Sequence, residues 1–258
     1  MLHSLFLRRR NFVLVALVVA LLSSSASAQT EKSPSDVVRD FYKAMREHRF
    51  KAAWALTVYK AAATDLTPQE MDDLLPFFEA QSAPIPETIQ INSEEIKGDV
   101  AQVFVQLPPT EESPQITSKP IDLIRSGGAW IIGTEPEQAK VKAAGHRYFL
   151  DAVIDLNHYN MVDVLKRLVG VQALFEQAHN GVFGDAKELL AAGLLSDDML
   201  DPRASGYNVR ITVSGDKKSY TAAAEPTHYG HTGKLSFWMD QSGAIKQADN
   251  GGKPLQPK

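Results

Sequence analysis

Apolar residues recur at intervals of three and four along residues 35–82, which is the spacing of amphipathic helices. The pattern predicts three helices, which begin near Ser35, near Phe50 and at Thr67. Thr67 and Glu70 are spaced as a capping box, with a proline at the first helical position between them. Pro76 lies inside the third helix, so we expect a kink or a break there.

The apolar spacing changes to that of β-strands after residue 86. Four β-rich runs follow, at about 89–91, 100–105, 121–124 and 129–132. Residues 97–99 and 126–128 are typical hairpin turns, and residues 107–119 form a proline-rich loop. The first part of the chain therefore predicts helices followed by a four-strand antiparallel meander.

A second helical region starts at Glu135 and ends at Asn180 and Gly181. Its apolar stripe is interrupted by four polar or aromatic residues, Asn157 to Asn160, which we interpret as a break between two helices. Asp185 opens a short helix. Four further strands are predicted by alternating runs at about 206–213, 219–224, 234–239 and 244–247.

Runs of helices followed by runs of strands are typical of α+β folds. We therefore predict an α+β chain with two parts. The first, residues 34–134, is the helical and meander domain. The second, residues 135–248, is a long helical segment joined to a small α+β domain with antiparallel strands. Residues 249–258 are polar and contain glycine and proline, so we expect a loose tail.

Residues 1–28 have the three parts of a secretory signal peptide. Arginines at 8–10 precede an apolar run at 12–22, and a small polar segment ends Ala26-Ser27-Ala28. We expect cleavage between Ala28 and Gln29, followed by a short spacer, residues 29–33. The alternative is an uncleaved anchor, although the run is shorter than the about 20 residues that a membrane span needs.

Arg9 and Arg10, with the residues up to Val13, partly match a twin-arginine signal. The strongly apolar run that follows favours the general secretory route. The sequence contains no cysteine, so we expect neither disulfides nor a lipoprotein anchor. The prediction is an exported, soluble protein of the periplasm or the extracellular space, with no membrane span once the leader is removed.

Charge narrows the classes of partner. Without the three leader arginines, the chain has 24 basic and 31 acidic residues, which gives a net charge of −7. Nucleic acids and anionic lipids select clustered Lys and Arg, so we expect neither as a partner.

The first half resembles exported domains of the nuclear transport factor 2-like (cystatin-like) fold. The resemblance is carried by two segments, 34–44 (PSDVVRDFYKA) and 123–130 (LIRSGGAW). It implies a curved sheet wrapped around helices, in a family that includes isomerases and dehydratases as well as non-catalytic binding domains.

The second half resembles the globular head of type IV pilin-like and type II secretion pseudopilin-like proteins. This resemblance rests on segments 171–175 (VQALF), 220–226 (YTAAAEP) and 236–243 (SFWMDQSG). A prepilin carries a Gly-Phe-type cleavage site and an apolar helix with a glutamate near its start. Residues 1–30 have neither, so the resemblance implies a pilin-like head without the helix that builds filaments.

The closest approach to metal-binding spacing is the pair His228 and His231, with Asp240 or Glu225 as a third ligand. The alternative is a polar strand connection with two solvated histidines. Candidate oxygen ligands for calcium follow the predicted strand at 234–239: Asp240, Ser242, Asp249 and Asn250. Their spacing matches no known calcium loop, and turn formation is the competing explanation.

Aromatic residues of the first domain are candidates to line a ligand cavity: Tyr42, Trp54 and Trp130, with His48 as an acid–base group. Their helical spacing equally fits core packing. The sequence has no nucleophile elbow, phosphate loop or dinucleotide-binding glycine pattern.

We therefore expect a non-catalytic exported module without a cofactor, which contacts protein partners in the cell envelope. One alternative is a small-molecule binder or weak enzyme that uses the first-domain cavity. Another is a secretion or pilus accessory protein.

Overall fold

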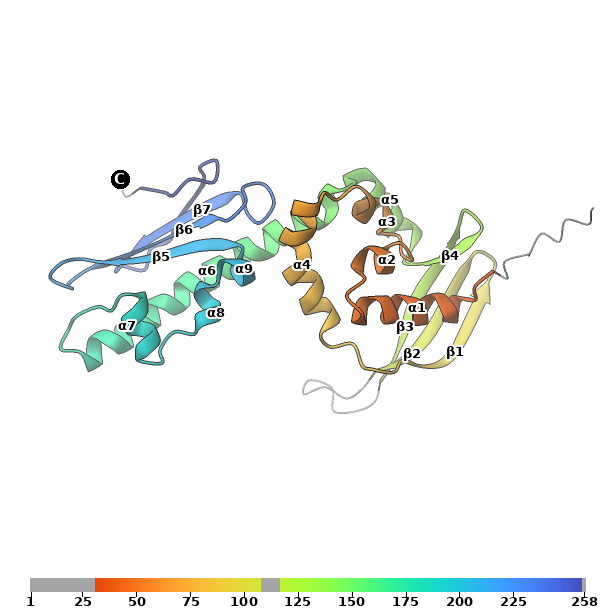
Figure 1. The fold of residues 1–258 in the computed structure, drawn as a ribbon, viewed down its shortest axis with the longest axis horizontal. Helices are drawn as coiled ribbons and strands as arrows, with labels where there is room; N and C mark the ends of the chain where they lie inside the picture. Colours follow the sequence, from red (N-terminus) through yellow and green to blue (C-terminus); the bar gives the residue numbers. More distant parts are fainter. Residues whose placement is uncertain (1–30, 108–116, 257–258) are drawn as a thin grey trace, which may run out of the picture. The chain divides into compact units, whose positions relative to one another are not determined.

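The computed structural model describes residues 31–107 and 117–256, and residues 32–258 form one compact unit (Figure 1). Four helices open this unit: α1 (Pro34–Arg46), α2 (Phe50–Trp54), α3 (Lys60–Thr64) and α4 (Pro68–Ser82). Ser33 caps α1, so this helix begins slightly before the predicted start. Thr67 and Glu70 form the predicted capping box of α4. Helix α4 continues through Pro76, and the short helix α3 was not predicted.

A four-strand antiparallel meander follows, as predicted: β1 (Gln90–Lys97), β2 (Val100–Leu107), β3 (Thr117–Ser126) and β4 (Ala129–Ile132). The tight turn between β1 and β2 is made by Gly98, whose φ of 64° is accessible to glycine at little cost. Helix α1 covers one face of the sheet, where Val37 and Val38 pack with Val103 and Leu123. Most of the predicted proline-rich loop lies outside the described residues.

The predicted long helical segment is two helices, α5 (Glu135–Ala144) and α6 (Arg147–Ala178). They are separated at Gly145, whose φ is 56°. The predicted break at Asn157–Asn160 is wrong, because α6 runs through these residues without interruption. Their polar side chains serve a different purpose, since Asn157 and His158 hydrogen-bond to the backbone of a distant loop.

Three short helices lead into the second sheet: α7 (Ala186–Ala191), which Asp185 caps as predicted, α8 (Asp197–Leu200) and α9 (Pro202–Ser205). The last two were not predicted. Four antiparallel strands complete the fold: β5 (Tyr207–Val213), β6 (Tyr220–Pro226), β7 (Leu235–Asp240) and β8 (Lys246–Asp249). The α+β class predicted from the sequence is confirmed.

Helix α6 contributes to two hydrophobic cores. Its first turns place Phe149, Leu150 and Val153 in the core formed by α1 to α4. Its later turns place Leu165 and Leu168 in the core beneath the second sheet. The first core therefore extends beyond residue 134, where the sequence places the boundary between the two parts.

The predicted signal peptide and its cleavage site, Ala28 and Gln29, lie outside the described residues. Within the described residues, no helix combines the length and the apolar character needed to cross a membrane. The described part of the tail forms a turn, in which the Asn250 side-chain amide donates hydrogen bonds to two backbone carbonyl groups, those of Lys253 and Pro254.

Candidate functional site

The loop at residues 227–233, which joins β6 to β7, is held in a compact conformation by its own threonines. The hydroxyl of Thr232 accepts a hydrogen bond from the backbone N–H of His228 at 3.0 Å and lies 2.9 Å from the hydroxyl of Thr227. Gly230 adopts a φ of 81°, and its N–H donates to the carbonyl of Gly233 at 2.8 Å. We call this segment the HYGH loop.

Asp73 of α4 binds both histidines of the HYGH loop. Nδ1 of His228 lies 2.6 Å from one carboxylate oxygen, and Nδ1 of His231 lies 3.0 Å from the other. Nε2 of Gln69 also donates to Asp73, at 3.1 Å. The Asp73 side chain is only 5% exposed, so these three donors offset the cost of removing its charge from water.

Helix α6 binds the HYGH loop from the other side. Asn157 donates from Nδ2 to the carbonyl of Thr232 at 3.0 Å, and Arg147 donates to the carbonyl of Gly230 at 2.8 Å. Nε2 of His158 accepts the backbone N–H groups of Lys234 and Leu235, at 3.0 and 3.2 Å. The loop is thus held between two helices that precede it in the sequence by about 70 to 160 residues.

The pKa values of His158 and Glu70, which lie near the loop, are both lowered. Burial lowers the pKa of His158, which favours the neutral ring that its acceptor role requires. Burial acts to raise the pKa of Glu70, but hydrogen bonds from Thr67 outweigh it and hold the pKa below its usual value. The nearby rings of His146 and His231 contribute in the same direction.

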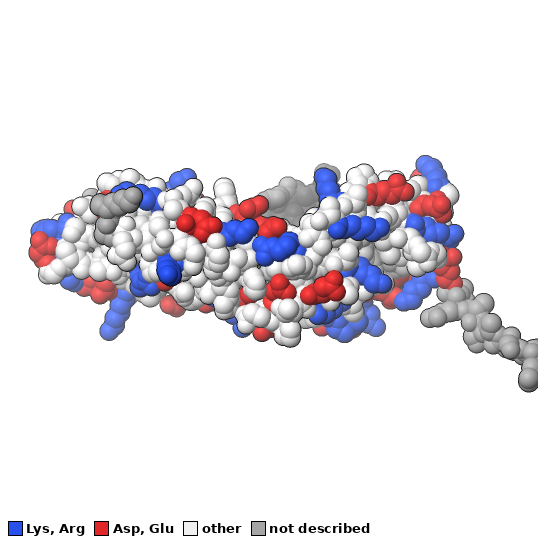
Figure 2. Space-filling view, turned by 90° about the horizontal axis from the view of Figure 1, so that it is seen from above, with Lys and Arg blue, Asp and Glu red and all other residues white. Residues whose placement is uncertain are grey.

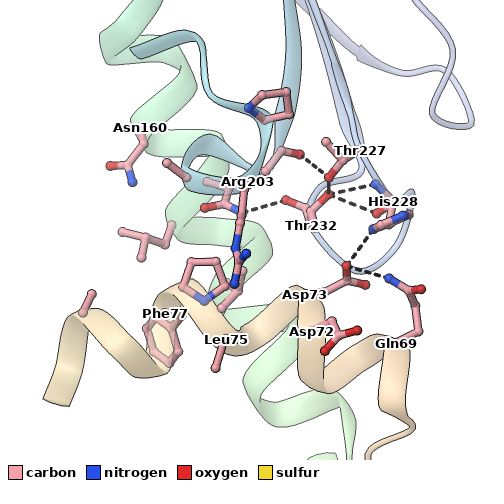
Figure 3. A pocket seen from close by; sticks show the side chains of 18 residues that line it. Gln69, Asp72, Asp73, Leu75, Phe77, Asn160, Arg203, Thr227, His228 and Thr232 are labelled. Atoms are coloured by element: carbon pink, nitrogen blue, oxygen red, sulfur yellow. Dashed lines mark hydrogen bonds and ion pairs between the residues drawn. The ribbon is translucent and has the colours of Figure 1, made fainter. Parts of the chain in front are cut away.

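A cleft of about 600 Å³ lies beside the HYGH loop, within the size range of ligand sites in proteins. Figure 3 shows α4 on one side, with α6 and the segment around Arg203 opposite. Its apolar walls include Leu75, Phe77 and Leu156, and its polar rim includes Asp72, Asn160 and His228.

Arg203 is the one arginine or lysine among the described residues that line the cleft. Its side chain extends from α9 toward α4 (Figure 3). Within the described residues its guanidinium has no ion-pair or hydrogen-bond partner, and only its backbone N–H is bonded, to Asp201. A guanidinium beside apolar side chains is suited to bind a planar anion such as a carboxylate.

The structure brings together two of the four candidate metal ligands, and Glu225 is paired with Arg210 instead. His228 and His231 converge, but on the carboxylate of Asp73, while Asp240 lies at the opposite end of β7. Each imidazole directs Nδ1 at a different carboxylate oxygen rather than at a shared point, so the two rings surround the carboxylate and not a common metal position. No group of three or more metal-ligating side chains occurs within the described residues.

The candidate calcium ligands Asp240 and Ser242 are engaged in a turn, and Asp249 joins β8 to the HYGH loop. Asp240 accepts hydrogen bonds from the N–H and hydroxyl of Ser242, which lower the pKa of its carboxyl. Asp249 accepts the hydroxyl of Tyr229 with both oxygens, at 3.0 Å each. These contacts are the ordinary chemistry of Asp and Asn in turns.

The aromatic cavity candidates pack in two separate cores. Trp54 is 5% exposed and contacts the rings of Phe78 and Phe149 in the helical core. Trp130 is buried in the core under the first sheet, against which Tyr42 packs, and burial raises the pKa of Tyr42. His48 lies elsewhere, stacked on Phe50 at the start of α2.

Sequence reasoning missed Asp73 and Arg203. Asp73 is an ordinary polar position of an amphipathic helix, and nothing in its local sequence connects it to histidines 155 and 158 residues away. Arg203 has one weak local signal, the Asp-Pro pair before it, which starts the short helix α9.

Comparison of the chain with models of protein families, with curated proteins and with solved structures finds no match.

Proposed function

We propose that this protein is an exported, non-catalytic binding module that recognises a protein partner of the cell envelope through the cleft between α4 and α9. The observation that carries the proposal is the combination of apolar walls with an unpaired arginine and free polar groups in one cleft. Sites of this composition bind ligands by burying apolar surface and orient them with a few polar groups.

The cleft takes the place of the first-domain cavity as the proposed site, because Trp54 and Trp130 are buried in core packing. The HYGH loop supplies one wall of the cleft. Its two histidines and Asp73 are bonded to one another, and this arrangement fixes the wall of the cleft.

Surface charge is consistent with a protein partner. Figure 2 shows acidic and basic side chains intermixed on the face that it draws. Nucleic acids select a continuous basic surface, which this pattern does not provide. Export, the nuclear transport factor 2-like assignment of the first half and the pilin-like assignment of the second half belong to the same proposal. They rest on the leader-like residues 1–28 and on the sequence segments described above.

Site-specific photo-crosslinking tests the proposal. A photoreactive phenylalanine analogue replaces Asn160, an exposed residue of α6 that lines the cleft. The matched control replaces Leu174, which is 56% exposed on the same helix and does not line the cleft. In an envelope extract of the source organism, we expect a discrete crosslinked protein from position 160 and none from position 174. Equal crosslinking at both positions, or none at position 160, would contradict the proposal.

A further inference from the structure

Arg203 and Asp72 carry the unpaired charges of the cleft among the described residues, and both are exposed. Arg203 is a cation without a partner among the described residues. The most deeply buried acid of the cleft, Asp73, is already bound by two imidazoles and an amide. The remaining acid, Asp72, is exposed at the rim. Arg203 is exposed as well, but its side chain extends toward the apolar residues of α4 (Figure 3), so it is the unpaired charge placed beside the apolar walls.

Apolar surface surrounds this charge and continues beyond the cleft. Leu75 and Phe77 of α4 line it together with Leu156 of α6. Leu156 is 43% exposed, and Tyr159, one helical turn further on, is 75% exposed. Such a surface suits a ligand longer than a small metabolite, one that fills the cleft with an apolar side chain and continues along α6.

The remaining polar groups match a peptide backbone. The side-chain amide of Asn160 has no hydrogen-bond partner within the described residues and carries both a donor and an acceptor, as a peptide group does. His228 lines the cleft with its ring 51% exposed, while Nδ1 is held by Asp73. The Nε2 edge of this ring is available as a further polar contact.

We propose that the ligand of the cleft is an extended peptide segment that carries an apolar side chain next to a carboxylate, and that Arg203 binds the carboxylate. The inference rests on the proposed function and names the class of partner segment. Arg203 offers a planar pair of N–H donors that fits both oxygens of a carboxylate. Leu75, Phe77 and Leu156 take the neighbouring apolar side chain.

The test uses the full chain and three sets of immobilised N-acetylated pentapeptide amides. Each set has Leu or Phe at the centre, and the adjacent position is Glu, Gln or Lys. We expect the Glu set to bind at least about tenfold more tightly than the matched Gln set, a difference that one charged hydrogen-bonding group can produce. The Lys set is expected to bind most weakly.

Variants assign the preference to Arg203. In Arg203→Gln the advantage of Glu over Gln peptides is expected to disappear, whereas Arg203→Lys retains part of it, because lysine keeps the charge but not the planar fork. Arg167→Gln is the matched control: this arginine is 68% exposed on α6, pairs with Asp163 and does not line the cleft. Asp72→Asn is expected to tighten binding of the Glu set a few-fold by removing a like charge.

The outcomes separate the inference from the function that it refines. One outcome is that the Gln and Glu sets bind with equal affinity and that Leu156→Asp weakens the binding of both. This result would leave the cleft as a binding site and overturn the carboxylate assignment. A Glu preference that survives Arg203→Gln would also overturn it. If no set binds and the Asn160 crosslink is absent as well, both proposals fail.

Discussion

His158 shows how a single half-buried side chain can organise a distant segment. Its ring lies on α6, accepts two backbone N–H groups at the start of β7 and contacts the rings of Tyr207 and Phe237. Protonation of Nε2 would place a donor against these two donors. The same burial that lowers its pKa therefore protects the hydrogen bonds that anchor the strand.

This residue is expected to make stability depend on pH. Below about pH 6.5 the unfolded chain binds a proton at His158 that the folded chain, with its lower pKa, does not. Its contribution to the free energy of unfolding is therefore complete above that pH and is lost as pH falls through the folded pKa. In urea titrations between pH 8 and pH 5, we expect the stability of the wild type to fall more steeply than that of His158→Gln. Parallel curves for the two proteins would contradict this interpretation.

At the scale of elements, the HYGH loop forms hydrogen bonds with both α4 and α6. Its backbone conformation comes from Thr227, Thr232 and Gly230, but its position comes from Asp73, Asn157 and Arg147. The loop's own residues stabilise its conformation, whereas contacts with α4 and α6 hold it in place. Its stability therefore depends on the helices that hold it.

Asp73→Asn is expected to lower the free energy of unfolding by about 1–3 kcal/mol. The asparagine keeps one acceptor oxygen, so one of the two imidazoles loses its partner in a nearly buried position. The matched control is Asp72→Asn, because Asp72 is the adjacent exposed acid on the same helix, and its cost is expected to stay within about 0.5 kcal/mol. Urea unfolding measures both variants. Equal effects would show that the Asp73 contacts contribute nothing beyond helix propensity.

At the scale of the whole compact unit, α6 is shared by two hydrophobic cores. It is a single helix of 32 residues, and neither Leu150 in the first core nor Leu165 in the second is exposed. Loss of either core removes the packing that stabilises one half of this helix. The HYGH loop adds a second connection between the same parts.

Unfolding of residues 32–258 is therefore expected to be one cooperative transition. Leu150→Ala and Leu165→Ala should each cost about 2–5 kcal/mol, and each should shift the same transition in differential scanning calorimetry. Two separate transitions, each lowered by only one of the variants, would show that the two cores unfold independently.

Much of this architecture could be predicted from local signals. The capping box of Thr67 and Glu70, the glycine turns between strands and the changes from helical to strand spacing each act within a few residues. They correctly indicated the α+β class, the meander and most elements. The break predicted at Asn157–Asn160 failed because polar residues inside a helix were taken as an interruption. Their partners, the carbonyl of Thr232 and two backbone N–H groups, lie about 75 residues away.

The sequence by itself determined most of the elements, because caps, turns and apolar periodicity depend on neighbours in the chain. It also marked His228 and His231 as a notable pair. Only the tertiary structure decided what that pair does, since Asp73 meets it through packing between α4 and a loop more than 150 residues later. The same holds for Arg203, whose isolation beside Leu75 and Leu156 is a property of three elements that are distant in sequence.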